Sequence, residues 1–236
     1  MAASLLARLA EEPDRTAIVL DVDGTLAPIV RRPEQATVPA ETRAELERLA
    51  VRYALVACVS GRPANDARRL VGVDGVEYVG LHGLELEAEA ERHRNAIHSF
   101  AETVDWPVED KGLTVSFHYR GVEDEEAARA QLERVASRAR NAGFHARFGR
   151  KVLEILPPVE AHKGTAVRHL LHRAHLNRAL YAGDDRTDLD AFRALEELEF
   201  GVRVAVASDE GPQELREAAD VVVDGPAELL RVLRGL

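Results

Sequence analysis

The sequence predicts an α/β fold in which a doubly wound parallel sheet carries a small inserted α+β domain. Short apolar runs alternate with helical segments towards both ends of the chain, a pattern typical of a parallel sheet covered by helices on both faces. The middle of the chain breaks this alternation. At 236 residues, the chain is long enough to form a core domain and an insert.

Six short apolar runs, each bounded by turn residues, predict the strands of the core sheet. Helically spaced apolar residues predict helices between most of them, and a capped helix leads in over 4–12. The expected strands are 17–20, 55–59, 76–81, 179–182, 202–207 and 221–223, and the expected helices are 41–52, 64–71, 163–173, 189–195 and 212–218. Ligands of such sheets bind beyond the carboxyl ends of the strands.

The segment 108–158 predicts a separate cap. Its apolar pattern indicates strands over 113–119, 146–148 and 152–156, and a helix over 123–141. The helix begins with acidic residues and carries arginines near its end, so its charges complement the helix dipole. Trp106-Pro107 and Pro157-Pro158 are typical of hinges. We therefore expect a Rossmann-like core of residues 1–107 and 159–236, with a cap of residues 108–158.

Charge and cysteine content limit the partners. The chain has 31 Lys and Arg against 41 Asp and Glu, a formal net charge of −10, which argues against nucleic acid or an anionic membrane as partner. The single cysteine, Cys58, lies in an apolar run, so we expect it to pack in the core and to form no disulfide. No apolar stretch is long enough to span a bilayer, and the charged N-terminal segment is too short for a secretory signal. We expect a cytoplasmic monomer.

Asp21 and Asp23 directly follow the first apolar run. Alternation along the chain places their carboxylates on one side, and Gly24 permits a sharp turn after them. Two adjacent carboxylates repel each other and resist desolvation, so a bound cation is the simplest compensation. A solvated Asp-x-Asp-Gly turn remains an equal alternative on this segment alone.

Polar residues also stand at two other positions where a site is expected. Ser60-Gly61-Arg62 follows the run 55–59 and combines a hydroxyl, a flexible backbone and a guanidinium. A plain strand-to-helix turn capped by serine is the alternative. Lys163 opens a helix, where an ammonium group and the helix N-terminus favour an anion. Taken alone, an ordinary surface lysine is the alternative.

An acidic cluster follows the run 179–182. Asp184, Asp185 and Asp188 place three carboxylates within five positions. One aspartate would suffice to cap a helix, so three indicate a metal ion and the groups that support its ligands. Oxygen ligands without nearby Cys or His favour Mg²⁺ over Zn²⁺.

The order of these motifs resembles the haloacid dehalogenase phosphatase superfamily. The resemblance implies that Asp21 is a nucleophile that forms an aspartyl phosphate, and that Asp23 is the general acid and then the general base. It further implies that Mg²⁺ is held by Asp21, the Asp23 backbone carbonyl and Asp184, with Asp185 and Asp188 in support. The phosphoryl oxygens would be held by Ser60, Gly61 and Lys163.

Further motifs are similar to those of the trehalose-6-phosphate phosphatase family from about residue 18 to the C-terminus. These motifs are Ala27-Pro28-Ile29, Val79 to Glu85, Glu109 to Gly112, His118-Tyr119-Arg120, Lys151 to Ile155 and Asp184 to Phe192. The family resemblance implies hydrolysis of trehalose 6-phosphate to trehalose and phosphate, in trehalose biosynthesis. It implies that the cap determines substrate specificity. The candidate sugar or phosphate contacts are Glu109, Lys111, His118 and Glu154 from the cap, and Arg62 and His82 from the core.

The chain departs from the family pattern at three positions. Leu189 stands where many members have an acidic residue, Leu156 where they have an arginine, and Val22 where an aromatic residue is frequent. One alternative function is a phosphatase of another sugar phosphate, sucrose 6-phosphate or mannosyl-phosphoglycerate. Another is a non-catalytic sugar-phosphate-binding or receiver-like regulatory domain, although receiver modules are much shorter and lack a cap.

Overall fold

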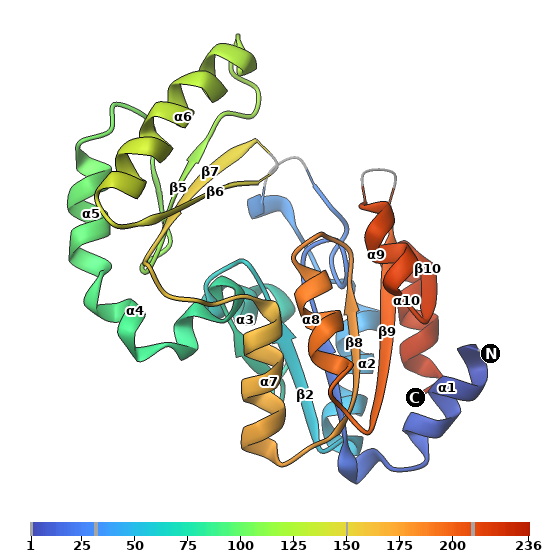
Figure 1. The fold of residues 1–236 in the computed structure, drawn as a ribbon. Coiled ribbons are helices and arrows are strands. Elements are labelled where there is room, and N and C mark those ends of the chain that lie inside the picture. The colour runs from blue at the N-terminus through green and yellow to red at the C-terminus, as the bar shows by residue number, and fades with distance from the viewer. Residues whose placement is uncertain (1, 31–32, 150, 209–210) are drawn as a thin grey trace. The chain divides into compact units, whose positions relative to one another are not determined.

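The computed structural model describes residues 2–30, 33–149, 151–208 and 211–236. The chain divides into two compact units, residues 1–83 with 161–236, and residues 84–160 (Figure 1). The first is the α/β core and the second is the inserted unit. Within the described residues, none of the helices combines the length and the apolar character that crossing a membrane requires.

The core is built on a six-stranded sheet in the order β10-β9-β8-β1-β2-β3, in which all neighbours pair in parallel. Its central strands are buried along their whole length, which explains why they are continuous apolar runs rather than alternating ones. The strands are β1 (Thr16–Leu20), β2 (Leu55–Val59), β3 (Glu77–Val79), β8 (Arg178–Gly183), β9 (Phe200–Ala207) and β10 (Val221–Asp224).

Helices cover both faces of this sheet, as the predicted doubly wound fold requires. The helices of the core are α1 (Ala2–Ala10), α2 (Ala40–Arg52), α3 (Ala64–Val71), α7 (Lys163–Ala174), α8 (Asp188–Leu195), α9 (Gln213–Ala218) and α10 (Gly225–Arg234). Short 3₁₀ turns are η1 (Pro13–Arg15), η2 (Pro33–Gln35) and η3 (Leu81–Leu86), the last spanning the boundary between the units. The helix α10 was not among the predicted elements.

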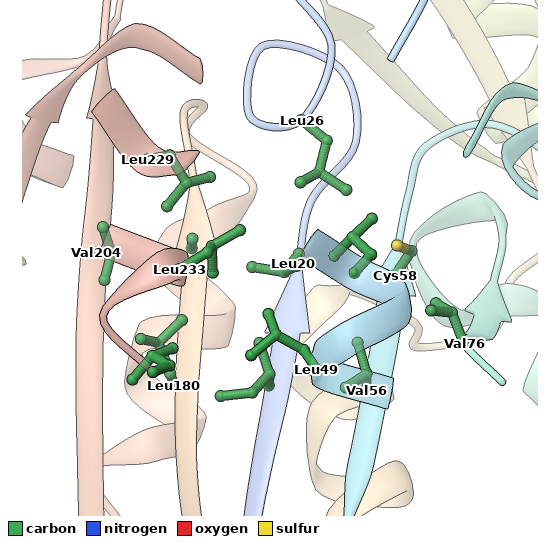
Figure 2. Close-up of a cluster of buried hydrophobic side chains, with 14 of the residues drawn as sticks. Leu20, Leu26, Leu49, Val56, Cys58, Val76, Leu180, Val204, Leu229 and Leu233 are labelled. Carbon is green, nitrogen blue, oxygen red and sulfur yellow. The ribbon is translucent and has the colours of Figure 1, made fainter. Parts of the chain in front are cut away.

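Apolar side chains from α2 and α10 pack onto one face of the core sheet. Figure 2 shows Leu49 of α2 and Leu233 of α10 lying over strand residues that include Leu20 and Leu180. Cys58 is fully buried in the same cluster, and burial raises the pKa of its thiol. The expected packing role of this cysteine is therefore confirmed.

The inserted unit is a four-stranded antiparallel sheet, ordered β4-β5-β7-β6, with helices on one face (Figure 1). Its strands are β4 (Glu109–Asp110), β5 (Val115–His118), β6 (His145–Gly149) and β7 (Val152–Leu156), and its helices are α4 (Ala88–Arg92), α5 (Arg94–Glu102) and α6 (Glu125–Asn141). Predicted strand and helix positions in 113–156 correspond to β5, α6, β6 and β7. The Asp124 carboxylate accepts from the Ala127 N–H at 2.9 Å, so α6 begins after this cap.

The inserted unit begins at residue 84, well before the expected boundary at 108. Ile97 and Ala101 of α5 belong to the same apolar cluster as Phe117 and Leu132, so α5 is part of this unit's core. The indole N–H of Trp106 donates to the carbonyl of His118 at 2.9 Å. This hydrogen bond joins the segment around Trp106 to strand β5 of the inserted sheet.

Candidate active site

The parallel order of the core strands brings the predicted motifs to one edge of the sheet. β1 lies between β2 and β8, and Leu20 pairs with both Cys58 and Ala182. The residues that follow these strands therefore start from neighbouring positions. The Asp21 N–H donates to the Ala182 carbonyl at 2.9 Å, which fixes the first acidic residue beside β8.

The turn after β1 packs against the acidic cluster that follows β8. Gly24 has a φ of +86°, and its N–H donates to the Ala27 carbonyl at 2.8 Å. A Cβ atom at Gly24 would collide with the carboxylate of Asp184. Glycine is therefore needed here both for the backbone conformation and for the close approach of Asp184.

Lys163 lies between two of the predicted carboxylates. Its Nζ is 2.8 Å from Asp21 Oδ1 and 2.7 Å from Asp188 Oδ1, and all three side chains are almost fully buried. Burial alone would lower the pKa of Lys163, but the charges of Asp188 and Asp21 outweigh it and raise that pKa. The lysine is therefore a fixed cation beside Asp21.

Asp188 is held by four donors. Its Oδ1 accepts from Lys163 Nζ and, at 2.6 Å, from the hydroxyl of Tyr181. Its Oδ2 accepts from the backbone N–H groups of Asp184 at 3.0 Å and Asp185 at 2.8 Å. A carboxylate oxygen usually accepts two hydrogen bonds, so both oxygens of Asp188 are fully used. Sequence reasoning missed Tyr181, because its ring sits within an apolar strand.

Asp21, Asp184 and Asp188 have carboxylate oxygens that all lie within 4.8 Å of one another. Burial, followed by the charge of Asp188, raises the pKa of Asp184 to about 7. Burial also raises the pKa of Asp21, although Lys163 opposes this. Because the oxygens of Asp188 are occupied, Asp21 and Asp184 are the two carboxylates suited to a cation. Hard oxygen donors fit a divalent ion such as Mg²⁺.

Asp23 lies apart from this buried cluster. Its Oδ2 accepts from Arg62 Nε and its Oδ1 from Arg62 Nη2, both at 2.7 Å. The Asp23 side chain is 42% exposed, against 6% for Asp21. The two aspartates of the first motif therefore occupy different environments, one buried beside a lysine and the other in a partly open ion pair.

The loops that carry Ser60 and His82 are joined. Ser60 is fully buried, and its Oγ accepts from the Arg62 N–H at 3.1 Å. The His82 N–H donates to the Ser60 carbonyl at 2.8 Å. A Cβ atom at Gly61 would lie 2.8 Å from Nε2 of His82, so glycine allows the imidazole to approach the loop. The structure thus brings these predicted residues together.

The four predicted residues of the inserted unit lie on one face of its sheet. His118 Nε2 is 2.7 Å from Glu109 Oε2, and Lys111 Nζ is 3.8 Å from Glu109 and 3.5 Å from Glu154. Arg147 extends the series, with Nη2 2.6 Å from Glu154 Oε2. We call these five residues the polar row. Arg147 was missed, although alternation along the predicted strand 146–148 would have placed it opposite the apolar face.

The core sheet with its inserted unit shares the fold of a solved haloacid dehalogenase-like hydrolase from Bacteroides thetaiotaomicron, with a TM-score of 0.60 at 16% identity. A family model described as trehalose-phosphatase matches residues 19–226. The chain belongs to the trehalose-phosphatase family.

The chain is similar to curated relatives and to a solved structure over three quarters of its length or more. A trehalose-phosphate phosphatase of Mycobacterium avium is 36% identical over 207 residues, covering 76% of this chain and 51% of the relative. An uncharacterized glycosyl hydrolase of Mycobacterium tuberculosis is 35% identical over 214 residues, covering 80% of this chain and 16% of the relative. The solved structure of a trehalose-6-phosphate phosphatase related protein has a TM-score of 0.74 at 24% identity, covering 92% of this chain and 95% of that one.

The chain therefore spans about half, or less, of the length of these two curated relatives. The likeness to the solved structure concerns the fold. Its coverage of both chains extends across the core and the inserted unit.

Proposed function

We propose that this chain is a Mg²⁺-dependent phosphatase that hydrolyses trehalose 6-phosphate to trehalose and phosphate, in trehalose biosynthesis. The observation that carries the proposal is the buried arrangement of Asp21, Lys163 and Asp184 at the edge of the core sheet. A carboxylate beside a fixed ammonium and a second carboxylate suits attack on an anionic phosphoryl group. Membership of the trehalose-phosphatase family supports the choice of substrate.

Asp21 is the proposed nucleophile. One of its oxygens forms a bond to phosphorus while the bond between phosphorus and the sugar oxygen breaks, leaving an aspartyl phosphate. Asp23 gives a proton to the departing sugar oxygen. Asp23 then takes a proton from a water molecule, whose oxygen attacks phosphorus. Phosphate leaves and the Asp21 carboxylate is restored.

The groups around Asp21 hold the phosphoryl oxygens in this scheme. Lys163 supplies a positive charge 2.8 Å from Asp21, and the Ser60 hydroxyl and the Gly61 backbone supply neutral donors. Most catalysis of phosphoryl transfer consists of such positioning and charge stabilisation.

Mg²⁺ would be held by Asp21, Asp184 and the backbone carbonyl of Asp23. When bound, it would neutralise charge on the phosphoryl oxygens and reduce their repulsion from Asp21. Asp188 and Asp185 would support the site without ligating it, since the oxygens of Asp188 already accept four hydrogen bonds.

Sugar recognition is assigned to polar groups on both units. The inserted unit offers polar and charged partners for the hydroxyl groups of the sugar: Glu109, Lys111, His118 and Glu154. Hydrogen bonds between a hydroxyl and a charged group are stronger than those between two neutral groups. From the core, Arg62 and His82 are the candidates. Arg62 pairs with Asp23 in the structure, so an incoming phosphate is a competing anion for the same guanidinium.

Phosphate release from a panel of sugar phosphates tests the proposal. Trehalose 6-phosphate, sucrose 6-phosphate and mannosyl-phosphoglycerate are compared at equal concentration, with Mg²⁺ and with chelator. We expect release from trehalose 6-phosphate only with Mg²⁺, and at the highest rate. Equal rates across the panel would contradict the substrate assignment, and no release from any of them would favour a binding domain.

The variant Asp21→Asn tests the proposed nucleophile in the same assay. The variant should fold, because Lys163 keeps Asp188 as a partner, but it should release no phosphate. Asp105→Asn, which alters an exposed aspartate of the inserted unit, is the matched control and should retain activity. Turnover by Asp21→Asn would rule out the nucleophilic role.

A further inference from the structure

Strand alternation gives the inserted sheet one apolar and one polar face. Val115, Phe117, Leu153 and Ile155 belong to the apolar cluster beneath the helices. Residues at the alternate positions point the other way. These include Ser116, Glu154 and, on the neighbouring strand, Arg147, which lies directly opposite Glu154 in the β6–β7 pairing.

Glu154 is the most enclosed charge of the polar row, with 8% of its surface exposed. Its Oε1 receives two long contacts, from Lys111 at 3.5 Å and Thr114 Oγ1 at 3.4 Å. Its Oε2 accepts a short hydrogen bond from Arg147 at 2.6 Å. A buried carboxylate needs a close partner. Arg147 is such a close partner and therefore helps to hold the charge and orientation of Glu154.

Arg147 also balances the charge of the row. Hydrogen bonding from His118 outweighs burial and lowers the pKa of Glu109, which keeps this carboxylate ionised. Lys111 is shared between Glu109 and Glu154 at 3.8 and 3.5 Å. Arg147 adds a guanidinium beside the second of these two carboxylates and so lessens the negative charge of the row. A net negative face would repel a phosphorylated sugar.

Ser116 adds unused hydrogen-bonding capacity at the centre of this face. It stands opposite Glu154 in one strand pairing and opposite Glu109 in the other. Its hydroxyl is buried, and no hydrogen-bond partner for it exists among the described residues. An unpaired buried hydroxyl is costly in free energy, so a partner from outside the chain would stabilise it.

We infer that Arg147 is a specificity-determining residue of the inserted unit, which positions Glu154 so that its carboxylate, with the Ser116 hydroxyl, accepts the hydroxyl groups of the sugar. This inference rests on the proposed function, because it takes a sugar phosphate as the substrate. Arg147 acts through Glu154 and takes no part in the phosphoryl transfer itself.

The test compares Arg147→Ala with Arg134→Ala, which removes an exposed arginine from α6 of the same unit. KM and kcat are measured for trehalose 6-phosphate and for p-nitrophenyl phosphate, which has no sugar. For Arg147→Ala we expect KM for trehalose 6-phosphate to rise roughly three- to tenfold, with kcat changed less, because a charge-assisted contact to Glu154 is lost. The ratio of kcat/KM between the two substrates should fall accordingly. Arg134→Ala should leave that ratio unchanged.

A second pair of variants keeps the inference falsifiable. If Arg147 acts through Glu154, adding Arg147→Ala to Glu154→Gln should cause little further loss. An additive loss, or an equal loss with both substrates in Arg147→Ala, overturns the inference. Arg147→Lys, which keeps the charge but not the planar guanidinium, should recover part of the ratio. Wild-type protein without preference for trehalose 6-phosphate would instead contradict the proposed function, which separates the two failures.

Discussion

Arg62 donates through Nε and Nη2 to the two carboxylate oxygens of Asp23, each at 2.7 Å. This two-point pairing fixes the plane of the carboxylate as well as its position. In this pair both oxygens of Asp23 accept from a residue that follows a different strand. Through Arg62, the Ser60-Gly61-Arg62 segment thereby holds the second aspartate of the Asp21–Asp23 motif in place. Under the proposed function, the incoming phosphate would compete for Arg62 and free Asp23 for its role as proton donor.

Replacing Asp23 by Asn should slow hydrolysis of trehalose 6-phosphate by roughly a hundredfold, the usual effect of losing general acid–base help. The bond-breaking step should suffer less with p-nitrophenyl phosphate, because 4-nitrophenolate departs without a proton. Pre-steady-state release of nitrophenolate measures that step alone. An equal loss in this step for both substrates would contradict the role of Asp23 as general acid.

Asp184 makes the stability of the metal-free protein depend on pH. Burial, and then the charge of Asp188, raises its pKa from 3.8 to about 7 in the folded chain. Between these two values the folded state holds a proton that the unfolded state has lost. The stabilising contribution is complete below 3.8 and is lost as the pH rises through 7. Thermal unfolding in chelator should therefore show Tm decreasing over this range.

Added Mg²⁺ should raise Tm more at pH 8 than at pH 5.5, because the ion binds the ionised carboxylate. Asp184→Asn cannot titrate and is the control. Its Tm should vary less with pH than that of the wild type, and its response to Mg²⁺ should be weaker. An identical pH profile for the two proteins would rule out Asp184 as the source.

Tyr181→Phe tests whether the Tyr181 hydroxyl positions Asp188 for activity or only contributes to stability. The hydroxyl donates to a buried carboxylate at 2.6 Å, so its loss should destabilise the fold by about 1.5–3 kcal/mol. It should also lower kcat roughly tenfold, because Lys163 and Asp188 shift relative to Asp21. Tyr53→Phe removes a hydroxyl that donates to the Leu236 carbonyl at 3.0 Å, in the same unit. This control should lose stability and keep kcat, whereas equal kcat in both variants would refute the positioning role.

Gly24→Ala should abolish Mg²⁺ binding and activity, because the added methyl group occupies the space of the Asp184 carboxylate. The φ of +86° adds conformational strain of about 1 kcal/mol. Gly121→Ala is the control: its φ is +75°, and nothing lies within 4 Å of the added atom. Calorimetric titration with Mg²⁺ should show binding in Gly121→Ala only. Unchanged binding in Gly24→Ala would show that Asp184 can move aside without loss.

Much of the core was predictable because each motif follows an apolar run. Once β1 and β8 are recognised as parallel strands, Asp21 and Asp184 must emerge at the same edge. The partners of single side chains were harder to foresee. Whether Asp23 joins the buried cluster or pairs with Arg62 depends on side-chain geometry across two loops, which local patterns do not encode.

In the inserted unit, too, the secondary structure could be predicted from the sequence, whereas the contacts between side chains could not. Its strands and the helix α6 follow from alternation and charge. Its starting point does not, since α5 joins through Ile97 and Ala101, apolar residues that could equally have packed on the other unit. The placement of Arg147 on the polar face could have been predicted from strand alternation, but only the cross-strand register identifies Glu154 as its partner.

The contact between Gly24 and Asp184 joins two loops of the core whose strands, β1 and β8, are hydrogen-bonded neighbours. The spacing of the acidic groups is thus set by backbone pairing in which the 84–160 segment takes no part. A change confined to that segment is therefore expected to leave the spacing of these carboxylates as it is. Under the proposed function, the choice of sugar and the transfer of phosphate could then vary independently of each other.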